Sequence, residues 1–372
     1  MEFTIAREAL YRPLQRIVGA VEKKQTLPIL SNVLVTVKSQ LLSLVGTDLE
    51  VEIIARVPLV HKAEPGEATV SARKLVDICR ALPDAAEIKF AFNDNKATIK
   101  SGRSRFSLAC LPAADFPKLE EGPGQIELSL SSRILSQLFE YTSFSMAQQD
   151  VRYYLNGLLL TFSSNEVRSV ATDGHRLATH VLPIDRPLSE PASVIIPRKA
   201  VLELERLFSE EQEDLGIVVS DSHLRAISTS YSFSTKLVEG KFPNYQRVLP
   251  QAVGHEAVLS RELFKQALAR VAVLFTDKFR GARFLFSENH LKVQATNAEK
   301  DEVEEELEIQ YVGPDLEIGF NISYIQEYLS VIKSPEVVLH LFDPNSSVLF
   351  EPRHQEDASA TMHSYVVMPM RI

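Results

Sequence analysis

The sequence predicts an α+β protein built from three copies of one unit, with helices packed on antiparallel sheets. Three observations lead to this fold class. The chain has 372 residues, which at roughly 100–200 residues per domain is enough for two to four domains. Short features recur along it at a nearly constant spacing. Each repeat also combines two amphipathic helical segments with runs of alternating apolar residues, a pattern typical of half-buried strands.

Three recurring features define the repeats: a Thr-containing string, the start of a second helix, and a Phe-Pro pair. The positions are Thr47, Thr172 and Thr296; Arg73, Arg198 and Ser323; and Phe116-Pro117 with Phe242-Pro243. Within each set, neighbouring members lie 124 to 126 residues apart. Chance similarity between amphipathic segments is the alternative, but three features at nearly one period favour repetition.

Each unit is predicted to begin with an amphipathic helix, followed by strands, a second helix and further strands. Ser131 and Ser260 stand where they cap the first helices of the second and third units, and Pro197 suits a helix entrance. The predicted helical segments are 6–24, 72–82, 131–146, 197–208, 260–275 and 321–333.

Apolar alternation over 32–37 and 41–57 predicts strands in the first unit. Gly and Pro interrupt the pattern near 121–125, and a second break lies near 251–255. The sequence therefore predicts three domains, comprising residues 1–122, 123–252 and 253–372.

The charge distribution bears on the binding partner. The net charge of −9, taken alone, argues against a nucleic-acid partner. The six helical segments, however, hold sixteen Lys and Arg against eight Asp and Glu, a net charge of +8, so the remainder carries −17. Ordinary solvated helix faces are the alternative explanation. A curved array with its helices inside would have a basic inner wall that binds phosphates without reading bases, and an acidic exterior.

Composition excludes several other classes. No apolar run reaches the ~18 residues of a membrane helix, and the first residues are too charged for a signal peptide. We therefore expect a cytoplasmic protein without a membrane partner. Cys79 and Cys110 have apolar flanks, so we expect buried thiols and no disulfide.

Several longer strings carry a resemblance to a known family. They are TLPILSN (26–32), GTDLEVE (46–52), GRSRFSL (102–108), LPAADFP (111–117), SMAQQDVRYYLNG (145–157), ATDGHRLA (171–178), KFPNY (241–245), DKFRG (277–281) and YVVMPMR (365–371). With these strings the chain resembles, over essentially its whole length, the bacterial sliding clamp, the β subunit of DNA polymerase III holoenzyme.

The resemblance implies three domains of the DNA-clamp fold and a head-to-tail homodimer. Two subunits would form a closed ring around duplex DNA, with helices lining the inner face and antiparallel sheets outside. It implies no catalytic residue, cofactor or metal. The implied partners are duplex DNA of any sequence, the replicative polymerase catalytic subunit, the clamp loader, and translesion polymerases and repair factors that carry short clamp-binding peptides.

In that family a pocket between the second and third domains holds the client peptide. The matching positions are Leu155, Thr172, Gly174, His175, Arg176, Leu177, Pro243, Arg247, Val248, Tyr324, Ser347, Val366, Met368, Pro369, Met370 and Arg371. Leu, Val, Pro and Met suit an adaptable apolar socket. From composition alone, 366–370 would be a plain final strand.

The resemblance also implies DNA and dimer contacts. The positions that match DNA contacts are Lys24, Arg73, Arg80, Arg103, Arg105, Gln149, Tyr153, Tyr154, Arg198 and Lys199. For Tyr153 and Tyr154 a place in the core is the alternative. The positions that match the dimer interface are Lys74, Phe106, Leu108, Val273 and Leu274.

Two other classes of function stay open at this point. Asp173 and His175 lie close enough in sequence for acid–base chemistry, although GxSxG, P-loop and Cys/His metal spacings do not occur. A repeat scaffold that binds only proteins is the second, and the basic helices speak against it. The family pattern is broken at 352–363, which is longer than usual before the final strand and reads as a surface loop.

Overall fold

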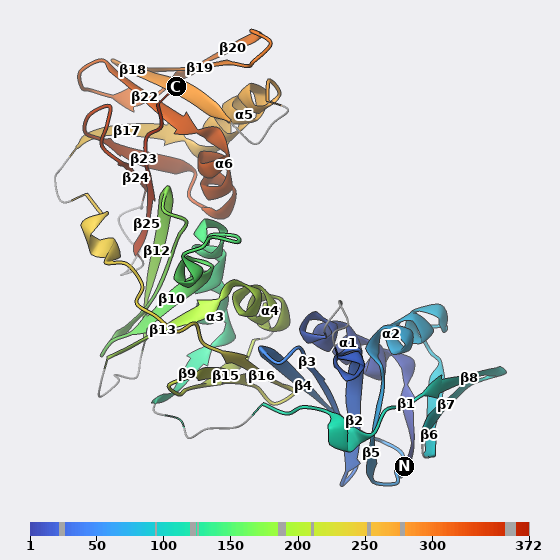
Figure 1. Ribbon diagram of the computed structural model, residues 1–372. Helices are drawn as coiled ribbons and strands as arrows, with labels where there is room; N and C mark the ends of the chain where they lie inside the picture. Colours follow the sequence, from blue (N-terminus) through green and yellow to red (C-terminus); the bar gives the residue numbers. More distant parts are fainter. Residues whose placement is uncertain are drawn as a thin grey trace. The chain divides into compact units, whose positions relative to one another are not determined.

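The computed structural model describes residues 1–21, 27–93, 95–119, 124, 126–184, 191–209, 212–250, 254–275, 280–353 and 362–371. The chain divides into two compact units (Figure 1). Unit 1 comprises Met1–Arg133 and Leu202–Leu237, and unit 2 comprises Ile134–Val201 and Val238–Ile372. The division cuts through the second repeat, because each of its two groups of strands continues the sheet of a neighbouring repeat.

The strands of unit 1 form two antiparallel sheets. They are β1 (Glu2–Ala6), β2 (Asn32–Lys38), β3 (Leu41–Thr47), β4 (Val51–Pro58), β5 (Gly66–Ser71), β6 (Glu87–Asn93), β7 (Lys96–Ser101), β8 (Ser104–Ala109), β9 (Ile126–Ser131), β14 (Asp214–Val219), β15 (His223–Ile227) and β16 (Tyr231–Lys236). Within the described residues the larger sheet has the order β5-β2-β3-β4-β16-β15-β14-β9, and the smaller has the order β1-β6-β7-β8. The pairing of β4 with β16, here called the first seam, joins the first repeat to the second.

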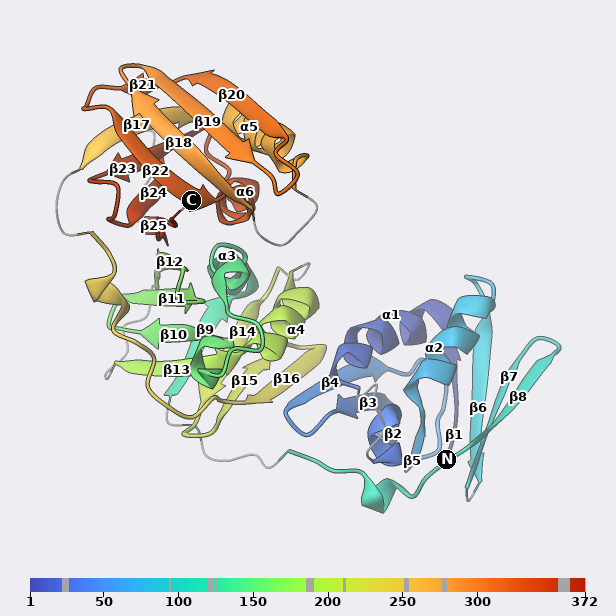
Figure 2. The ribbon, with the colours of Figure 1, turned by 45° about the horizontal axis from the view of Figure 1, so that its top comes forward.

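The strands of unit 2 follow the same plan. They are β10 (Gly157–Phe162), β11 (Glu166–Thr172), β12 (Arg176–Pro183), β13 (Ala192–Pro197), β17 (His255–Ser260), β18 (Gly281–Ser287), β19 (His290–Thr296), β20 (Glu302–Glu308), β21 (Gln310–Tyr311), β22 (Leu316–Asn321), β23 (Glu336–Leu341), β24 (Val348–Pro352) and β25 (Met362–Val367). In the described part of the unit, one sheet has the order β13-β10-β11-β12-β25-β24-β23-β17-β21 and the other β20-β19-β18-β22 (Figure 2). The pairing of β12 with β25, the second seam, joins the second repeat to the third.

Helices form where the sequence predicts them. They are α1 (Arg7–Ile17), α2 (Ala72–Ala81), α3 (Ser132–Glu140), α4 (Arg198–Phe208), α5 (Arg261–Ala272) and α6 (Ile322–Val331). Short 3-10 turns follow or link them: η1 (Val18–Ala20), η2 (Pro28–Ser31), η3 (Ala113–Asp115), η4 (Ser143–Ser145), η5 (Tyr153–Leu155) and η6 (Tyr245–Arg247). The predicted cap at Ser260 is confirmed, because its side chain accepts the Leu263 N–H.

One feature of the predicted unit is wrong. Each unit begins with a strand and not with a helix: β1, β9 and β17 run directly into α1, α3 and α5. These strands have only five or six residues, and their half-exposed alternation merges with the first turn of the following helix. A window long enough to detect the 3.6-residue period therefore absorbs them into the helix.

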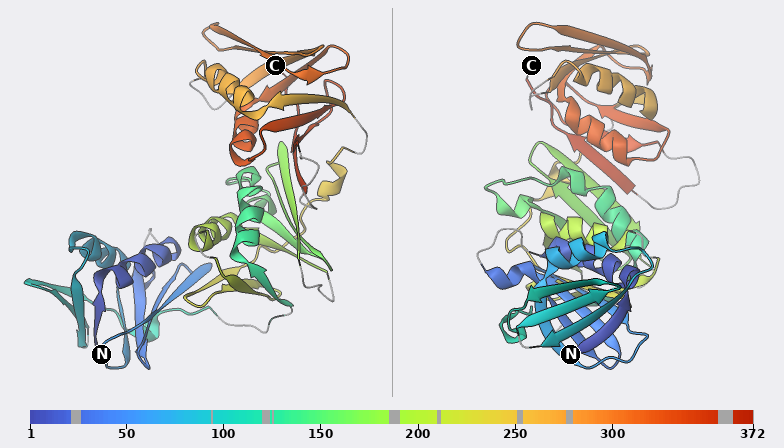
Figure 3. Two further views of the ribbon diagram at one scale, coloured as in Figure 1. Left: turned by 180° about the vertical axis from the view of Figure 1, so that it is seen from behind. Right: turned by 90° about the vertical axis from the view of Figure 1, so that its right-hand side faces the viewer.

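Apolar helix faces hold each layer together. α1 lies beside α2, and α5 lies beside α6 (Figure 3). In α1, Leu10, Leu14 and Ile17 are fully buried, whereas the basic residues of the first repeat's second helix, Arg73 and Arg80, are exposed. The positive charge of the helical segments thus lies largely on helix faces that do not pack on the sheets.

The repeat spacing is reproduced in the fold. Thr47, Thr172 and Thr296 are the last residues of β3, β11 and β19. The predicted surface loop 352–363 lies largely outside the described residues, between Pro352 and Met362. Cys79 and Cys110 are buried and free, and burial raises the pKa of the Cys79 thiol to about 11. In the part of the chain that the structure describes, no helix is both long and apolar enough to cross a membrane.

Candidate functional site

A tight turn between β11 and β12 forms the centre of the expected peptide site. Thr172 Oγ1 donates to the Arg176 carbonyl oxygen at 2.6 Å and accepts the Gly174 N–H at 3.1 Å. The Asp173 carboxylate accepts the N–H groups of His175 and Arg176 at 2.9 and 3.0 Å. Gly174 has a φ of +91°, in the region that favours glycine. These local bonds explain why TDGHR forms a turn between two strands.

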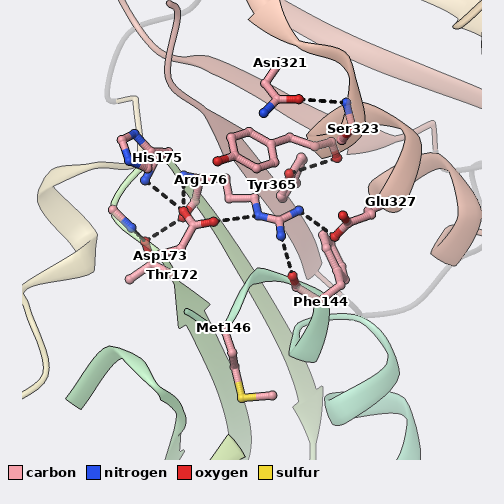
Figure 4. Close-up of polar contacts among 12 residues, drawn as sticks. Phe144, Met146, Thr172, Asp173, His175, Arg176, Asn321, Ser323, Glu327 and Tyr365 are labelled. Atoms are coloured by element: carbon pink, nitrogen blue, oxygen red, sulfur yellow. Dashed lines mark hydrogen bonds and ion pairs between the residues drawn. The ribbon is translucent and has the colours of Figure 1, made fainter. Parts of the chain in front are cut away.

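Arg176 ties this turn to the third repeat (Figure 4). Its Nε donates to Asp173 at 3.0 Å, its Nη1 to Glu327 of α6 at 2.8 Å, and its Nη2 to the Phe144 carbonyl at 2.7 Å. The guanidinium also lies over the Tyr324 ring, 4.4 Å from its centroid. Burial acts to lower the pKa of Arg176, but the neighbouring Tyr365 and carboxylates outweigh it and the pKa is raised. Arg176 is therefore a structural cation of the second seam.

The same contacts bear on the acid–base hypothesis. Both carboxylate oxygens of Asp173 accept hydrogen bonds from the turn itself, two from backbone N–H groups and one from Arg176. His175 contributes its carbonyl oxygen to the Met368 N–H at 2.9 Å. These bonds give the Asp173 carboxylate and the His175 backbone a structural role in the turn and at the second seam. Across the described ranges, no group of three or more His, Cys, Asp or Glu side chains is arranged to hold a metal ion.

A hollow of about 160 Å³ opens beside this turn at the second seam. It is lined by Arg152, Leu155, Thr172, Gly174, Arg176, Leu177, Pro243, Tyr245, Val248, Val366 and Met368. The structure thus brings nine of the expected pocket residues to one wall, although they come from three distant parts of the chain. The expected residues outside this lining are His175, Arg247, Tyr324, Ser347, Pro369, Met370 and Arg371.

Two lining residues, Arg152 and Tyr245, were missed in the sequence. Both lie inside motifs that the sequence displays, SMAQQDVRYYLNG and KFPNY, so their positions were available. The Arg152 guanidinium is held by the Asp150 carboxylate through bonds of 3.0 and 2.8 Å. It also closes one side of Gly174, where an added Cβ would lie 3.0 Å from the Arg152 Nη atoms.

The floor of the hollow is apolar. Leu177 of β12 lies directly opposite Val366 of β25, and both are buried. Leu155 and Phe242 are buried in the same cluster, and Tyr245 and Val248 pack against it. An apolar floor with a few polar groups at the rim is typical of a site for a short apolar ligand.

A second, more polar hollow of about 560 Å³ shares Arg176 with the first. Its lining includes Asp150, Asp173, Glu327 and Arg198. Arg198 donates to the Met146 carbonyl at 3.1 Å, and burial together with the charge of Arg176 lowers its pKa. One of the expected DNA contacts therefore lies beside the expected peptide site.

The remaining expected DNA contacts fall in both units. Lys24 lies outside the described residues. In unit 1, Arg73, Arg80, Arg103 and Arg105 are exposed, and in unit 2, Gln149 and Lys199 are exposed. Tyr153 is 58% exposed, whereas Tyr154 is half-buried and packs against the floor cluster. The alternative of a core position is therefore wrong for Tyr153. Tyr154 is neither fully buried in the core nor fully exposed.

The expected dimer contacts lie on one edge strand and on or just after two helices. β8 is an edge strand, and its Phe106 and Leu108 are half-buried, not fully outward as alternation alone suggests. Lys74 is exposed on α2. Just after α5, Val273 is 83% exposed, whereas Leu274 is half-buried against the core of the third repeat.

Comparison with known proteins gives one consistent result. Family models of the DNA polymerase III β subunit match residues 1–120 (N-terminal domain), 129–244 (central domain) and 246–371 (C-terminal domain). The chain is 50% identical to the β sliding clamp of Pseudomonas aeruginosa and 47% identical to that of Escherichia coli K12, over 100% of both chains in each case. A crystal structure of the Pseudomonas aeruginosa clamp bound to griselimycin matches with a TM-score of 0.95 at 50% identity, and one of the Caulobacter crescentus clamp with 0.91 at 32%, both over the full length of each chain.

Proposed function

Because this chain belongs to the family of the DNA polymerase III β subunit, the β sliding clamps, we propose that it encircles duplex DNA as a closed ring and tethers the replicative polymerase. The function of a DNA sliding clamp follows from the family. The three matched ranges support three domains, which we propose as residues 1–122, 123–252 and 253–372.

A head-to-tail dimer is supported by two edge strands of opposite charge. β8 and β20 each end a sheet within the described residues, so each presents unpaired backbone groups. Arg103 immediately precedes β8 and Arg105 lies within it, and both are exposed. In contrast, β20 exposes four acidic residues, Glu302, Glu304, Glu306 and Glu308. Opposite charges favour the pairing of these edges between two copies.

The position of α5 fits the same interface. Arg270, near the end of α5, holds Glu305 of β20 through two bonds of 2.6 Å. This contact ties the end of α5, three residues before the exposed Val273, to the acidic strand. Apolar anchors near the centre of an interface usually dominate its energy. We propose that Val273 and Leu274 meet Phe106, Leu108 and Lys74 of a second copy.

Sequence-independent DNA binding is supported by the exposed basic residues of the helices. Positive charge is offered by Arg73, Arg80 and Lys199, but without the fixed geometry that the reading of base edges requires. Such contacts are weak, sensitive to salt and equal for all sequences, which suits a ring that slides. Gln149, Tyr153 and Tyr154 would add polar and aromatic contacts from one short segment.

Client binding is supported by the hollow at the second seam, which is the observation that carries the proposal. A short peptide with two apolar anchors would bury them against Leu177, Pro243 and Val248. Full burial of one such side chain contributes about 1.5–3 kcal/mol. After the cost of ordering the peptide, a micromolar Kd is expected. We propose as clients the replicative polymerase catalytic subunit, the clamp loader, translesion polymerases and repair factors.

We propose that the protein is non-catalytic, needs no cofactor or metal, and works in the cytoplasm. A scaffold that binds only proteins is the competing function, and DNA retention separates the two. We expect the protein, once loaded, to stay on circular DNA and to slide off the ends of the same DNA after linearisation. Retention that is equal on both forms would contradict a ring, and no retention on either would favour the scaffold.

A further inference from the structure

The first repeat contains a copy of the turn that borders the hollow at the second seam, here called the client hollow because we propose that it binds clients. Thr47 Oγ1 donates to the Val51 carbonyl at 2.9 Å and accepts the Leu49 N–H at 3.1 Å. The Asp48 carboxylate accepts the N–H groups of Glu50 and Val51 at 3.0 and 2.8 Å. Each bond has its counterpart 125 residues later, in the turn from Thr172 to Arg176.

The strand across each seam is also held in the same way. At the first seam the Lys236 N–H donates to the Glu50 carbonyl at 2.9 Å. At the second seam the Met368 N–H donates to the His175 carbonyl at 2.9 Å. Both seams therefore present the same backbone frame, and their side chains decide what that frame holds.

The chain segments that lie over the two frames correspond as well. Phe116 is buried in a cluster with Leu34 and Val45, as Phe242 is buried in the floor of the client hollow. A proline follows each phenylalanine. Two residues beyond that proline, the first copy has Leu119, whose N–H donates to the Glu52 carboxylate at 3.3 Å. The second copy has Tyr245, which lines the open hollow.

Two substitutions distinguish the frames. Where the second seam has the apolar floor residue Leu177, the first has Glu52, which is 7% exposed and lies opposite Ser234. Where the second seam has Gly174, the first has Leu49, at a φ of +79°. A buried carboxylate repels an apolar anchor, because its charge needs polar partners. The Leu49 side chain is 37% exposed, so the buried difference between the two frames is the carboxylate of Glu52.

From these contacts we propose that the first seam is a second peptide cradle, which Glu52 keeps closed by fastening the chain's own segment 117–119 over it through the Leu119 N–H. The ligand class is a short peptide with two apolar anchors, so the inference rests on the proposed client function. It predicts that a chain with two equivalent frames binds one client peptide.

The test counts peptides per chain by calorimetric titration with a client-type peptide containing Gln, Leu and Phe. Wild type is expected to bind one peptide per chain. The variant Leu49→Gly/Glu52→Leu is expected to bind two, the second within about tenfold of the first in Kd, since it recreates the Gly and Leu of the open frame. The reciprocal variant Gly174→Leu/Leu177→Glu is expected to bind none. Glu52→Gln, which keeps an oxygen acceptor for the Leu119 N–H, is the matched control and should still bind one.

The outcomes separate the two proposals. A wild-type protein that binds no peptide would contradict the client function itself. Two peptides per wild-type chain would overturn the closed cradle and leave the client site intact. One peptide per chain in a folded Leu49→Gly/Glu52→Leu variant would also overturn it. If that variant does not fold, Glu52→Ala, which deletes the carboxylate without added volume, must show a second, weaker site.

Discussion

Arg176 Nη1 lies 2.8 Å from Glu327 Oε2, so one side chain of β12 in the second repeat is bonded to helix α6 of the third. The same guanidinium fixes the Asp173 turn and borders the client hollow. The shape of the hollow therefore depends on a contact whose two partners are 151 residues apart.

Replacing Arg176 tests this contact. Arg176→Ala removes a buried cation, takes one of three hydrogen bonds from Asp173 and leaves the Phe144 carbonyl without this donor. We therefore expect a loss of about 3 kcal/mol in unfolding free energy. Glu327→Ala is the matched control. The Glu327 side chain is 46% exposed, so its loss should cost about 1 kcal/mol or less. Urea titration monitored by circular dichroism measures both. Equal losses in the two variants would show that Arg176 acts through Glu327 alone.

The C-terminal wall of the hollow can be removed without touching the proposed ring contacts. Deletion of 368–372 takes away Met368 and its bond to the His175 carbonyl. We expect client-peptide binding to fall below detection in fluorescence anisotropy, because one side of the apolar socket is gone. The dimer and its retention on circular DNA should persist. Full-strength binding by the truncated protein would remove this hollow from the proposed function.

The dimer prediction concerns Val273 and Leu274. Val273→Ala/Leu274→Ala is expected to shift the protein to monomer at low micromolar concentration, since anchor residues commonly contribute 2 kcal/mol or more, on the order of a thirtyfold change in Kd. Val312→Ala is the matched control, because Val312 is similarly exposed, at 78%, but lies away from α5 in sequence. Sedimentation velocity measures the fraction of dimer in each variant. A monomer from the control, or an intact dimer from the double variant, contradicts the assignment.

The DNA prediction concerns the salt dependence of binding. Each lost phosphate contact should flatten the slope of log K against log salt by roughly 0.9 for duplex DNA. Lys24→Ala, Arg73→Ala and Arg198→Ala should each do so, and equally for any sequence. Arg283→Ala removes the same charge from a strand of the third repeat and should leave the slope unchanged. A loss of binding for one DNA sequence only would rule out charge-based contact.

A pH prediction follows from His180, which lies opposite His363 across the second seam and stacks on Tyr141 with centroids 4.6 Å apart. Burial lowers the pKa of His180 to about 4. In the unfolded chain the pKa is about 6.5, so between these values the unfolded state binds the additional proton. Stability should therefore fall as the pH drops from about 6.5 to 4, by about 3 kcal/mol from this group.

His180→Gln isolates that contribution. The variant lacks the titrating ring, so its unfolding midpoint should fall less steeply over the same pH window. Carboxylates titrate equally in both proteins, and the difference between the two curves reports His180. Parallel curves for wild type and variant would show that His180 takes no part in the acid response.

The local elements could be predicted from the sequence because their signals are local. Ser260 caps α5 three residues from its partner N–H, and the predicted helical segments contain the six α-helices found among the described residues. The strands β1, β9 and β17 were missed because each is shorter than one window of helical periodicity. For the client hollow, the family strings supplied most of its residues, whereas Arg152 and Tyr245 were overlooked within strings already in view.

The sequence by itself determined the threefold repeat and the family, because spacing and motif strings are properties of the chain. Only the tertiary structure decided which of the two equivalent turns is open. Glu52 and Leu177 occupy the same place in two copies of one frame. The sequence alone does not tell whether a carboxylate or a leucine at that place opens or closes the seam, because this depends on the residues that pack around it. Folding buries Glu52 beside the Leu119 N–H and sets Leu177 against Val366. Packing over long sequence distances thus distinguishes the seam that we propose is closed from the hollow that we propose binds clients.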